Sequence, residues 1–166
     1  MQTSMWGITH TAAVRLKLAG VTLLTLALAL PAFATLGGDQ LSVEADRTQM
    51  KATATVQVTK ADGYSVHEIK APTGIVVREY VSDEGRVFGV AWSGPFIPNM
   101  QQLLGSYFQQ YSAGVKAHHE AAHGRQPLSI QQPGLVVVNT GHMRSFHGRA
   151  YDPGLLPQGI TANAVR

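Results

Sequence analysis

Residues 53–92, TATVQVTKADGYSVHEIKAPTGIVVREYVSDEGRVFGVAW, decide the fold that we expect for this chain. At the start of this stretch, residues 53–59, apolar and polar side chains alternate, which is typical of a strand with one buried face. Three turn signals follow at nearly even spacing, 61–63, 71–74 and 82–85, and each ends in a glycine that can take positive φ. Because connections this short join antiparallel neighbours, the stretch predicts a four-stranded meander.

A helix is expected directly after the meander. Pro98 and Asn99 supply the chemistry of a helix start. A wide apolar stripe at helical spacing follows, formed by Met100, Leu103, Leu104, Tyr107, Phe108 and Tyr111. Such a stripe indicates packing against the sheet rather than a cofactor site.

Shorter strand signals return near the C-terminus, at residues 128–131, 135–138 and 143–151, with turns predicted at 133–134 and 139–141. The predicted fold class is therefore α+β: an antiparallel meander of about four strands, packed by one amphipathic helix, with about three further C-terminal strands. We expect residues 35–166 to form a single domain, which opens on a weak helical pattern at 35–50. Within it, 112–127 is a histidine-rich connector and 152–166 an extended tail over the surface.

The N-terminus has the pattern of a secretory signal peptide. Arg15 and Lys17 precede an unbroken apolar run of thirteen residues, Leu18–Leu30, and Pro31 then leads to small residues at Ala32 and Ala34. The run is short for a spanning helix, which needs about 20 apolar residues. We therefore expect residues 1–34 to be cleaved, no stable membrane span to remain, and the protein to be periplasmic or secreted.

Composition excludes several functional classes. The chain has no cysteine, so thiol catalysis, disulfides and cysteine-based zinc sites are absent. Hydrophobic residues make up 45% and charged ones 14%, which does not fit a disordered chain. Without the leader, 11 Lys and Arg face 10 Asp and Glu with no basic cluster, so nucleic acid is not an expected partner.

The meander predicts a polar sheet face. If the second turn is centred between Pro72 and Thr73, His67 pairs with Arg78, and Tyr80 lies on the same face. We take His67, Arg78 and Tyr80 as the first candidate ligand-binding residues. The alternative is a half-solvated sheet face that binds nothing.

The last predicted hairpin gives a second candidate group, His142, Arg144 and Arg149, which could bind an anion. Exposed charges that only solubilise an edge strand are the alternative interpretation.

One catalytic motif occurs in the sequence, H-E-x-x-H at residues 119–123. On a helix His119 and His123 share a face and could hold one zinc ion, and Glu120 could act as general base. The motif lacks the third histidine of the metzincin extension, no glutamate follows Glu120, and Gly124 ends the helix early. We therefore expect no metal, no cofactor and no catalytic residue, with zinc bound by His119 and His123 as the alternative.

Several motifs resemble those of the bacterial family catalogued as domain of unknown function 2844. The matching stretches are 34–38 (ATLGG), 66–69 (VHEI), 76–81 (VVREYV), 85–95 (GRVFGVAWSGP), 102–108 (QLLGSYF), 141–144 (GHMR) and 148–150 (GRA). The resemblance implies a small exported bacterial protein without an assigned activity or cofactor. It names no catalytic residues, and the string at 119–123 is not among the family's motifs.

These observations favour a non-catalytic binding or structural protein of the cell envelope, whose ligand or protein partner the residues do not identify. Two alternatives remain open: a zinc-dependent hydrolase that uses His119, Glu120 and His123, and a histidine-based divalent-metal binder without catalysis.

Overall fold

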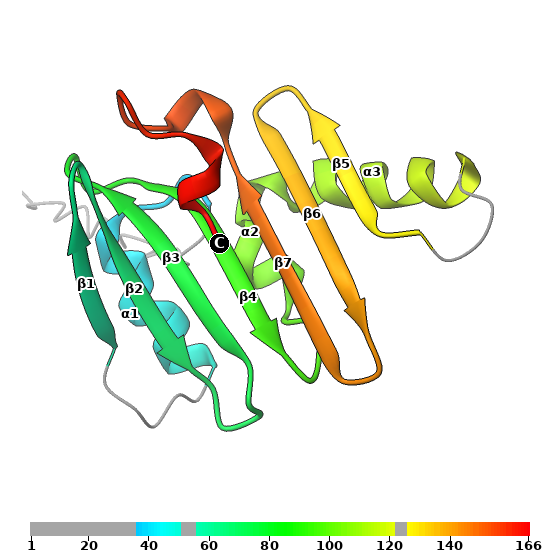
Figure 1. Cartoon of the computed structure of the whole chain (residues 1–166), viewed down its shortest axis with the longest axis horizontal. Helices are drawn as coiled ribbons and strands as arrows, with labels where there is room; N and C mark the ends of the chain where they lie inside the picture. Colours follow the sequence, from blue (N-terminus) through cyan, green and yellow to red (C-terminus); the bar gives the residue numbers. More distant parts are fainter. Residues whose placement is uncertain (1–35, 51–55, 122–125) are drawn as a thin grey trace, which may run out of the picture.

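Seven antiparallel strands form one sheet in the computed structural model, which describes residues 36–50, 56–121 and 126–166 (Figure 1). The strand order is β1-β2-β3-β4-β7-β6-β5. The strands are β1 (Gln57–Ala61), β2 (Tyr64–Lys70), β3 (Val76–Ser82), β4 (Val87–Gly94), β5 (Leu128–Gln132), β6 (Leu135–His142) and β7 (Ser145–Tyr151). The α+β fold is confirmed, with the predicted meander on one side and the C-terminal strands on the other. The predicted leader, residues 1–34, lies outside the described residues.

The meander follows from its turn glycines. Gly63, Gly74 and Gly85 have φ values of 78°, 83° and 80°, which L-residues with a Cβ rarely adopt. They reverse the chain between β1 and β2, β2 and β3, and β3 and β4. Of the predicted first strand, residues 53–55 lie outside the described part, and β1 begins at Gln57.

The predicted helix is present and contains an interruption. It comprises α2 (Met100–Leu104), a short 3-10 turn (Gly105–Tyr107) and α3 (Phe108–Ala121). Asn99 caps it as expected, because its side-chain oxygen accepts hydrogen bonds from the amides of Gln101 and Gln102. Gly105 has φ 47°, and this left-handed residue ends α2. Helix α3 continues to Ala121, through residues expected to form a connector.

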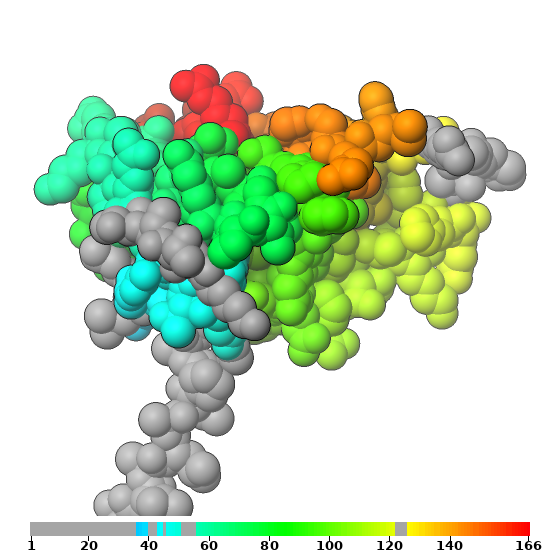
Figure 2. Space-filling view, turned by 90° about the horizontal axis from the view of Figure 1, so that it is seen from below, coloured from blue at the N-terminus to red at the C-terminus, as the bar shows by residue number. Residues whose placement is uncertain are grey.

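The helices and the C-terminal tail lie on opposite faces of the sheet. Figures 1 and 2 show α1 (Gln40–Gln49), α2 and α3 on one side and residues 152–166 on the other. We call these the helix face and the tail face. The helix face holds the main core, with Ile69, Val77, Val90, Leu103 and Leu135 among its buried members. No helix within the described ranges is both long and apolar enough to cross a membrane.

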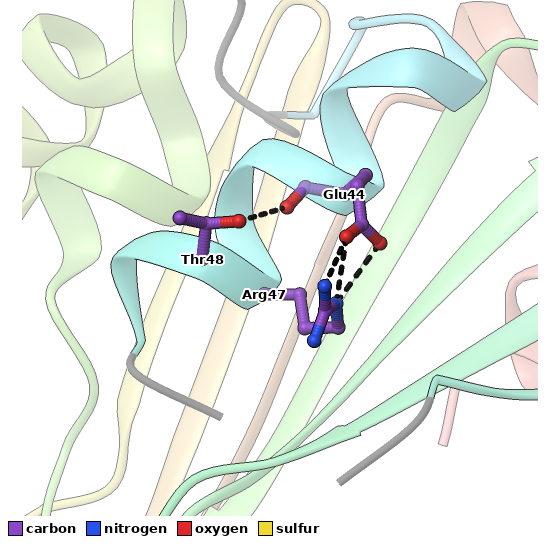
Figure 3. A network of polar contacts seen from close by, with 3 residues as sticks. All are labelled: Glu44, Arg47 and Thr48. Atoms are coloured by element: carbon purple, nitrogen blue, oxygen red, sulfur yellow. Dashed lines mark hydrogen bonds and ion pairs between the residues drawn. The ribbon is translucent and has the colours of Figure 1, made fainter. Parts of the chain in front are cut away.

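Helix α1 is held against the sheet at both its start and its middle. Before it, the amide of Leu36 donates to the carbonyl of Leu103 (3.1 Å), and the amide of Gly37 to that of Val87 (2.8 Å). Val43 is buried in the main core. On its exposed side, Arg47 pairs with Glu44, whose carbonyl also accepts from Thr48 Oγ1 at 3.0 Å (Figure 3). The predicted helical pattern at 35–50 is thus confirmed over Gln40–Gln49.

The predicted register between β2 and β3 is wrong by one residue. His67 pairs with Glu79, and Arg78 pairs with Glu68. His67 therefore lies on the helix face, 5% exposed, and not on a polar face beside Arg78. The connection between the strands is longer than a turn centred at 72–73, because the ladder closes at Lys70 and Val76.

The strands also differ from simple alternation in one place and from a predicted turn in another. Tyr80 lies opposite Gly89, and a bulge after Tyr80 then places Val81 opposite Val87. The last turn lies at Met143 and Arg144 rather than at 139–141, because β6 continues to His142 and pairs it with Ser145.

Candidate functional site

The tail face of the sheet holds the candidate site. Its aromatic side chains form a second apolar cluster, in which Tyr80 and Phe88 are buried and Tyr64 packs on both. The ring centroids of Tyr64 and Phe88 lie 5.7 Å apart, nearly perpendicular to each other. Val165, Leu155 and Ile160 of the tail cover this cluster. The tail leaves the neighbouring part of the sheet open.

Two arginines flank that open part. Arg78 of β3 and Arg149 of β7 both pair with Ala91 of β4, so the three residues form one row across the sheet. Neighbouring strands lie about 4.8 Å apart, which puts the two arginine backbones about 10 Å from each other on either side of a small residue. Side chains in one row point to the same face. The pairing therefore places the two guanidinium groups on either side of Ala91, whose small side chain leaves space between them.

Arg78 is oriented by an ion pair. Its Nε donates to Glu68 Oε2 at 2.8 Å, and Lys70 Nζ lies 3.2 Å from the other oxygen of the same carboxylate. Partial burial raises the pKa of Glu68, but the hydrogen bonds from Lys70 and Arg78 outweigh it and hold the pKa below its ordinary value. Glu68 thus stays ionised and holds Arg78 at the edge of the open part.

Arg149 is oriented by the tail. Its Nη1 donates to the carbonyls of Ala162 (3.2 Å) and Val165 (3.0 Å). The last residue of the tail, Arg166, is held by the Tyr80 hydroxyl, which donates to its carbonyl (2.5 Å) and accepts from its amide (3.0 Å). Carbonyls do not neutralise a guanidinium charge, so Arg149 keeps its full charge in the site.

These groups surround a hollow of about 240 Å³, which we call the arginine hollow. Its lining comprises Arg78, Trp92, Ser93, Val138, Thr140, His147, Gly148, Arg149 and Arg166, and includes no Asp or Glu residue. A second hollow of about 430 Å³ shares Arg78 and Arg166 with it and also includes Glu68 and Tyr80. The arginine hollow is the more strongly cationic of the two.

The structure brings together only some of the predicted site residues. Arg78 and Arg149, which we assigned to separate groups, line the same hollow, and Tyr80 lies beside it. His142 and Arg144 are exposed at the end of the β6–β7 hairpin and do not line this hollow.

His147, Thr140 and Arg166 also line the arginine hollow and were not among the predicted residues. The sequence offered a signal for His147: it is two residues from Arg149 on the same strand, and residues two apart share a face. No local signal marks Thr140 or Arg166, since the first is placed by pairing with β7 and the second by the path of the tail.

A buried acidic pair lies on the helix face. Asp46 of α1 and Glu79 of β3 are both fully buried, and Gln102 Nε2 donates to Asp46 Oδ1 at 2.9 Å. Burial, and then the nearby Asp46 carboxyl, raise the pKa of Glu79 well above its ordinary value. Burial is the largest cause, and the Asp46 carboxyl adds to it through its charge and through a hydrogen bond with the protonated acid.

His67 lies in the register position next to Glu79. Its Nε2 is 3.1 Å from Ser65 Oγ, and burial lowers the pKa of the imidazole. His67 lines neither the arginine hollow, nor the second hollow, nor the one beside the β5 start and the β6–β7 hairpin. We assign the buried polar cluster to the attachment of α1, not to ligand binding.

Comparison with known proteins gives a family. Residues 32–165 match the family described as "Protein of unknown function (DUF2844)". The chain belongs to the DUF2844 family. No curated protein and no solved structure matches it. The sequence resemblance is thereby confirmed.

The DUF2844 match extends over nearly all of the described fold. It includes Arg78, His147 and Arg149 and ends one residue before Arg166. The description of the family assigns no activity.

The H-E-x-x-H string of this DUF2844 protein is only partly described. His119 and Glu120 are exposed in the last turn of α3, and His123 lies outside the described residues. Among the residues with assigned positions, no three His, Asp or Glu side chains converge as metal ligands would. The ring of His119 is 6.3 Å from that of its neighbour His118. No observation of the structure therefore favours the zinc alternatives.

Proposed function

We propose that this DUF2844 protein is an exported, non-catalytic binding protein of the cell envelope that holds a small anion in the arginine hollow. The ligand class is a compact carboxylate or phosphate compound. The observation that carries the proposal is the lining of the hollow, where Arg78, Arg149 and Arg166 meet His147 and no Asp or Glu side chain takes part. Guanidinium groups bind carboxylates and phosphates through paired, charge-assisted hydrogen bonds.

The arrangement of the two strand arginines supports this function. Arg149 is fixed by two carbonyls and Arg78 by one carboxylate, so neither needs to be ordered when a ligand arrives. Thr140 and Ser93 add hydroxyl groups to the same lining. A volume of about 240 Å³ suits a small ligand and not a polymer.

Export is the second part of the proposal, and the leader pattern at residues 1–34 supports it. The expected product begins at Thr35. N-terminal sequencing and intact mass of the protein recovered outside the cytoplasm test this directly. A product that retains Met1 in the cell membrane would contradict it.

The binding proposal predicts saturable binding of inorganic phosphate, pyrophosphate or succinate, measured by titration calorimetry. Replacing Arg78 or His147 by glutamine removes a donor to the ligand, and we expect Arg78→Gln to weaken binding by about ten-fold or more. Arg86→Gln is the matched control, because Arg86 is an exposed arginine outside the hollow.

Absence of saturable binding for all three probes would contradict the proposed ligand class. An equal loss of affinity in Arg78→Gln and Arg86→Gln would show that the anion responds to overall charge and not to the hollow. Circular dichroism of each variant establishes that the fold is retained.

A further inference from the structure

Three exposed apolar side chains gather at one end of the sheet. The described residues have four exposed large hydrophobic side chains, namely Met143 (88% exposed), Phe96 (53%), Val58 (51%) and Ile97 (44%). Met143 is at the tip of the β6–β7 hairpin, and Phe96 and Ile97 follow the end of β4. Gly94 at the end of β4 pairs with Phe146 near the start of β7. The segment after β4 and the hairpin tip therefore lie at the same end of the sheet.

The β2–β3 connection reaches the same end. A Cβ placed on Gly74 would lie 3.5 Å from the ring of Pro95, so residues 71–75 contact the segment after β4. We call these three segments, 71–75, 95–99 and 143–144, the apolar end. Figure 1 shows them at the bottom of the sheet, and Figure 2, seen from below, shows the hairpin tip beside the segment that follows β4.

The hairpin tip has a disfavoured backbone. Met143 and Arg144 have φ values of 47° and 70°, and they are the only non-glycine residues with positive φ in the described part of the chain. A two-residue hairpin loop with two positive φ values favours Asn-Gly, which adopts this conformation readily. The tip instead presents a long apolar side chain and a cation to solvent. Strained positions of this kind are typical of functional sites.

Charge differs between the two ends of the sheet. The apolar end contains Arg144 and no Asp or Glu, whereas the turns at the opposite end contain Asp62, Asp83 and Glu84 against one cation, Arg86. Lys70, at the base of the β2–β3 connection, is paired with Glu68. An anionic surface would therefore attract the apolar end and repel the opposite one.

We propose that the apolar end docks the protein onto the surface of an anionic phospholipid bilayer. Met143, Phe96 and Ile97 enter the boundary between headgroups and acyl chains, and Arg144 contacts the phosphates. A fluid lipid layer suits apolar side chains carried on separate loops, and the charge of the apolar end complements anionic lipid. This contact is distinct from the arginine hollow and does not depend on it.

The test is flotation of the processed protein, beginning at Thr35, with lipid vesicles. The processed form avoids any contribution from the apolar run Leu18–Leu30. We expect binding to vesicles of phosphatidylcholine with phosphatidylglycerol, and much weaker binding to phosphatidylcholine alone. Raising the salt concentration should weaken binding, because it screens the contribution of Arg144.

The decisive variant carries Met143→Asn and Arg144→Gly together. Because Asn-Gly suits the turn, this variant should unfold at a higher urea concentration than the wild type, so poor folding cannot explain a loss of binding. We expect it to lose about ten-fold or more in vesicle affinity. Phe96→Ser should also weaken binding. Val58→Ser, on the distant edge strand β1, is the matched control and should bind as the wild type does.

Several outcomes would overturn the proposal. These are no binding to phosphatidylglycerol vesicles, unchanged binding in the double variant, or an equal loss in Val58→Ser. Loss of binding in Arg78→Gln with the double variant unaffected would show that the lipid phosphate is bound in the arginine hollow instead. A dimer in solution that the double variant converts to a monomer, without vesicle binding, would assign the apolar end to a second copy of the chain.

Discussion

Single glycines allow close packing at the centre of this sheet. Gly148 of β7 pairs with Trp92 of β4, and the indole ring lies directly over it. A Cβ at position 148 would lie 2.2 Å from Trp92 Cζ2 and 2.4 Å from Cε2, distances that real atoms do not adopt. Gly89 likewise leaves room for Val165 of the tail, which a Cβ would approach to 2.6 Å. The sheet can thus carry bulky side chains on strands that lie only about 4.8 Å apart.

Replacement of Gly148 by alanine should therefore destabilise the protein. The indole of Trp92 is fully packed and has to shift, so we expect the free energy of unfolding to fall by about 1–3 kcal/mol. Urea denaturation measures this. Gly154→Ala is the control, because its Cβ would meet nothing closer than Asp152 Oδ1 at 3.3 Å. Equal midpoints for Gly148→Ala and the wild type would contradict the packing argument.

At the level of elements, a buried pair of carboxyl groups lies between α1 and β3. Asp46 is on the inner side of α1 and Glu79 is on β3, while Gln102 of α2 and His67 of β2 complete the surroundings. The raised pKa of Glu79 means that the folded state keeps this carboxyl protonated over a range where the unfolded chain loses the proton. The attachment of α1 is therefore sensitive to pH.

This sensitivity predicts how Glu79→Gln behaves. Because folding raises the pKa of Glu79, its contribution to stability is fully present below about pH 4.5, the ordinary value, and is lost as the pH rises through the folded value. Glutamine resembles the protonated acid and has no proton to lose. The variant should therefore gain stability relative to the wild type as the pH rises, by about 1.4 kcal/mol for each unit of raised pKa.

Urea midpoints of the two proteins between pH 4.5 and 8 provide the measurement. Comparison of the two proteins at the same pH reduces the contribution of His67, whose pKa burial lowers in the wild type. Glu84→Gln is the control, since the hydrogen bond from Ser82 lowers the pKa of that exposed carboxyl and gives no such gain. A difference that stays constant across the range would contradict a raised pKa for Glu79.

The strands and turns of the meander could be predicted from the sequence, whereas the residues on each of its two faces could not. The turn glycines Gly63, Gly74 and Gly85 mark the strand ends, and the structure uses all three. The faces of β2 were assigned wrongly because both carry apolar residues: Ile69 packs under the helices, while Val66 packs under the tail. Alternation of apolar and polar residues identifies the buried face of a strand only when the other face is exposed to solvent. Here both faces of the sheet are largely covered.

The C-terminal hairpin shows a second limit. Asn139-Thr140-Gly141 has ordinary turn chemistry, yet β6 runs through it, and the turn is made by Met143 and Arg144. Pairing with β7 outweighs the local preference at this position. The arginine hollow depends on the same long-range pairing, because Arg78 and Arg149 meet only when β4 and β7 lie side by side.

At the scale of the whole molecule, the sheet has two halves, each made of strands that are consecutive in the sequence. The pairing of β4 with β7, which we call the seam, joins them. Strands β1 to β4 form one half and β5 to β7 the other, and β4 and β7 are the only described strands that connect them. Helices α2 and α3 lie between the two halves in the sequence, whereas α1 precedes β1. The arginine hollow lies across the seam, since its lining comes from both sides. Ligand binding there would therefore stabilise the junction of the halves.

During synthesis or refolding, the seam has a further consequence. During synthesis the first four strands are complete before β7 is made, and during refolding β4 is an open edge until β7 docks; in both cases this edge bears Val90 and Trp92. An open, apolar edge pairs with whatever strand it meets, including the same strand of another molecule. The yield of refolding should accordingly fall as protein concentration rises, and a chain cut after Gly94 should form aggregates that the whole chain avoids by supplying its own partner strand.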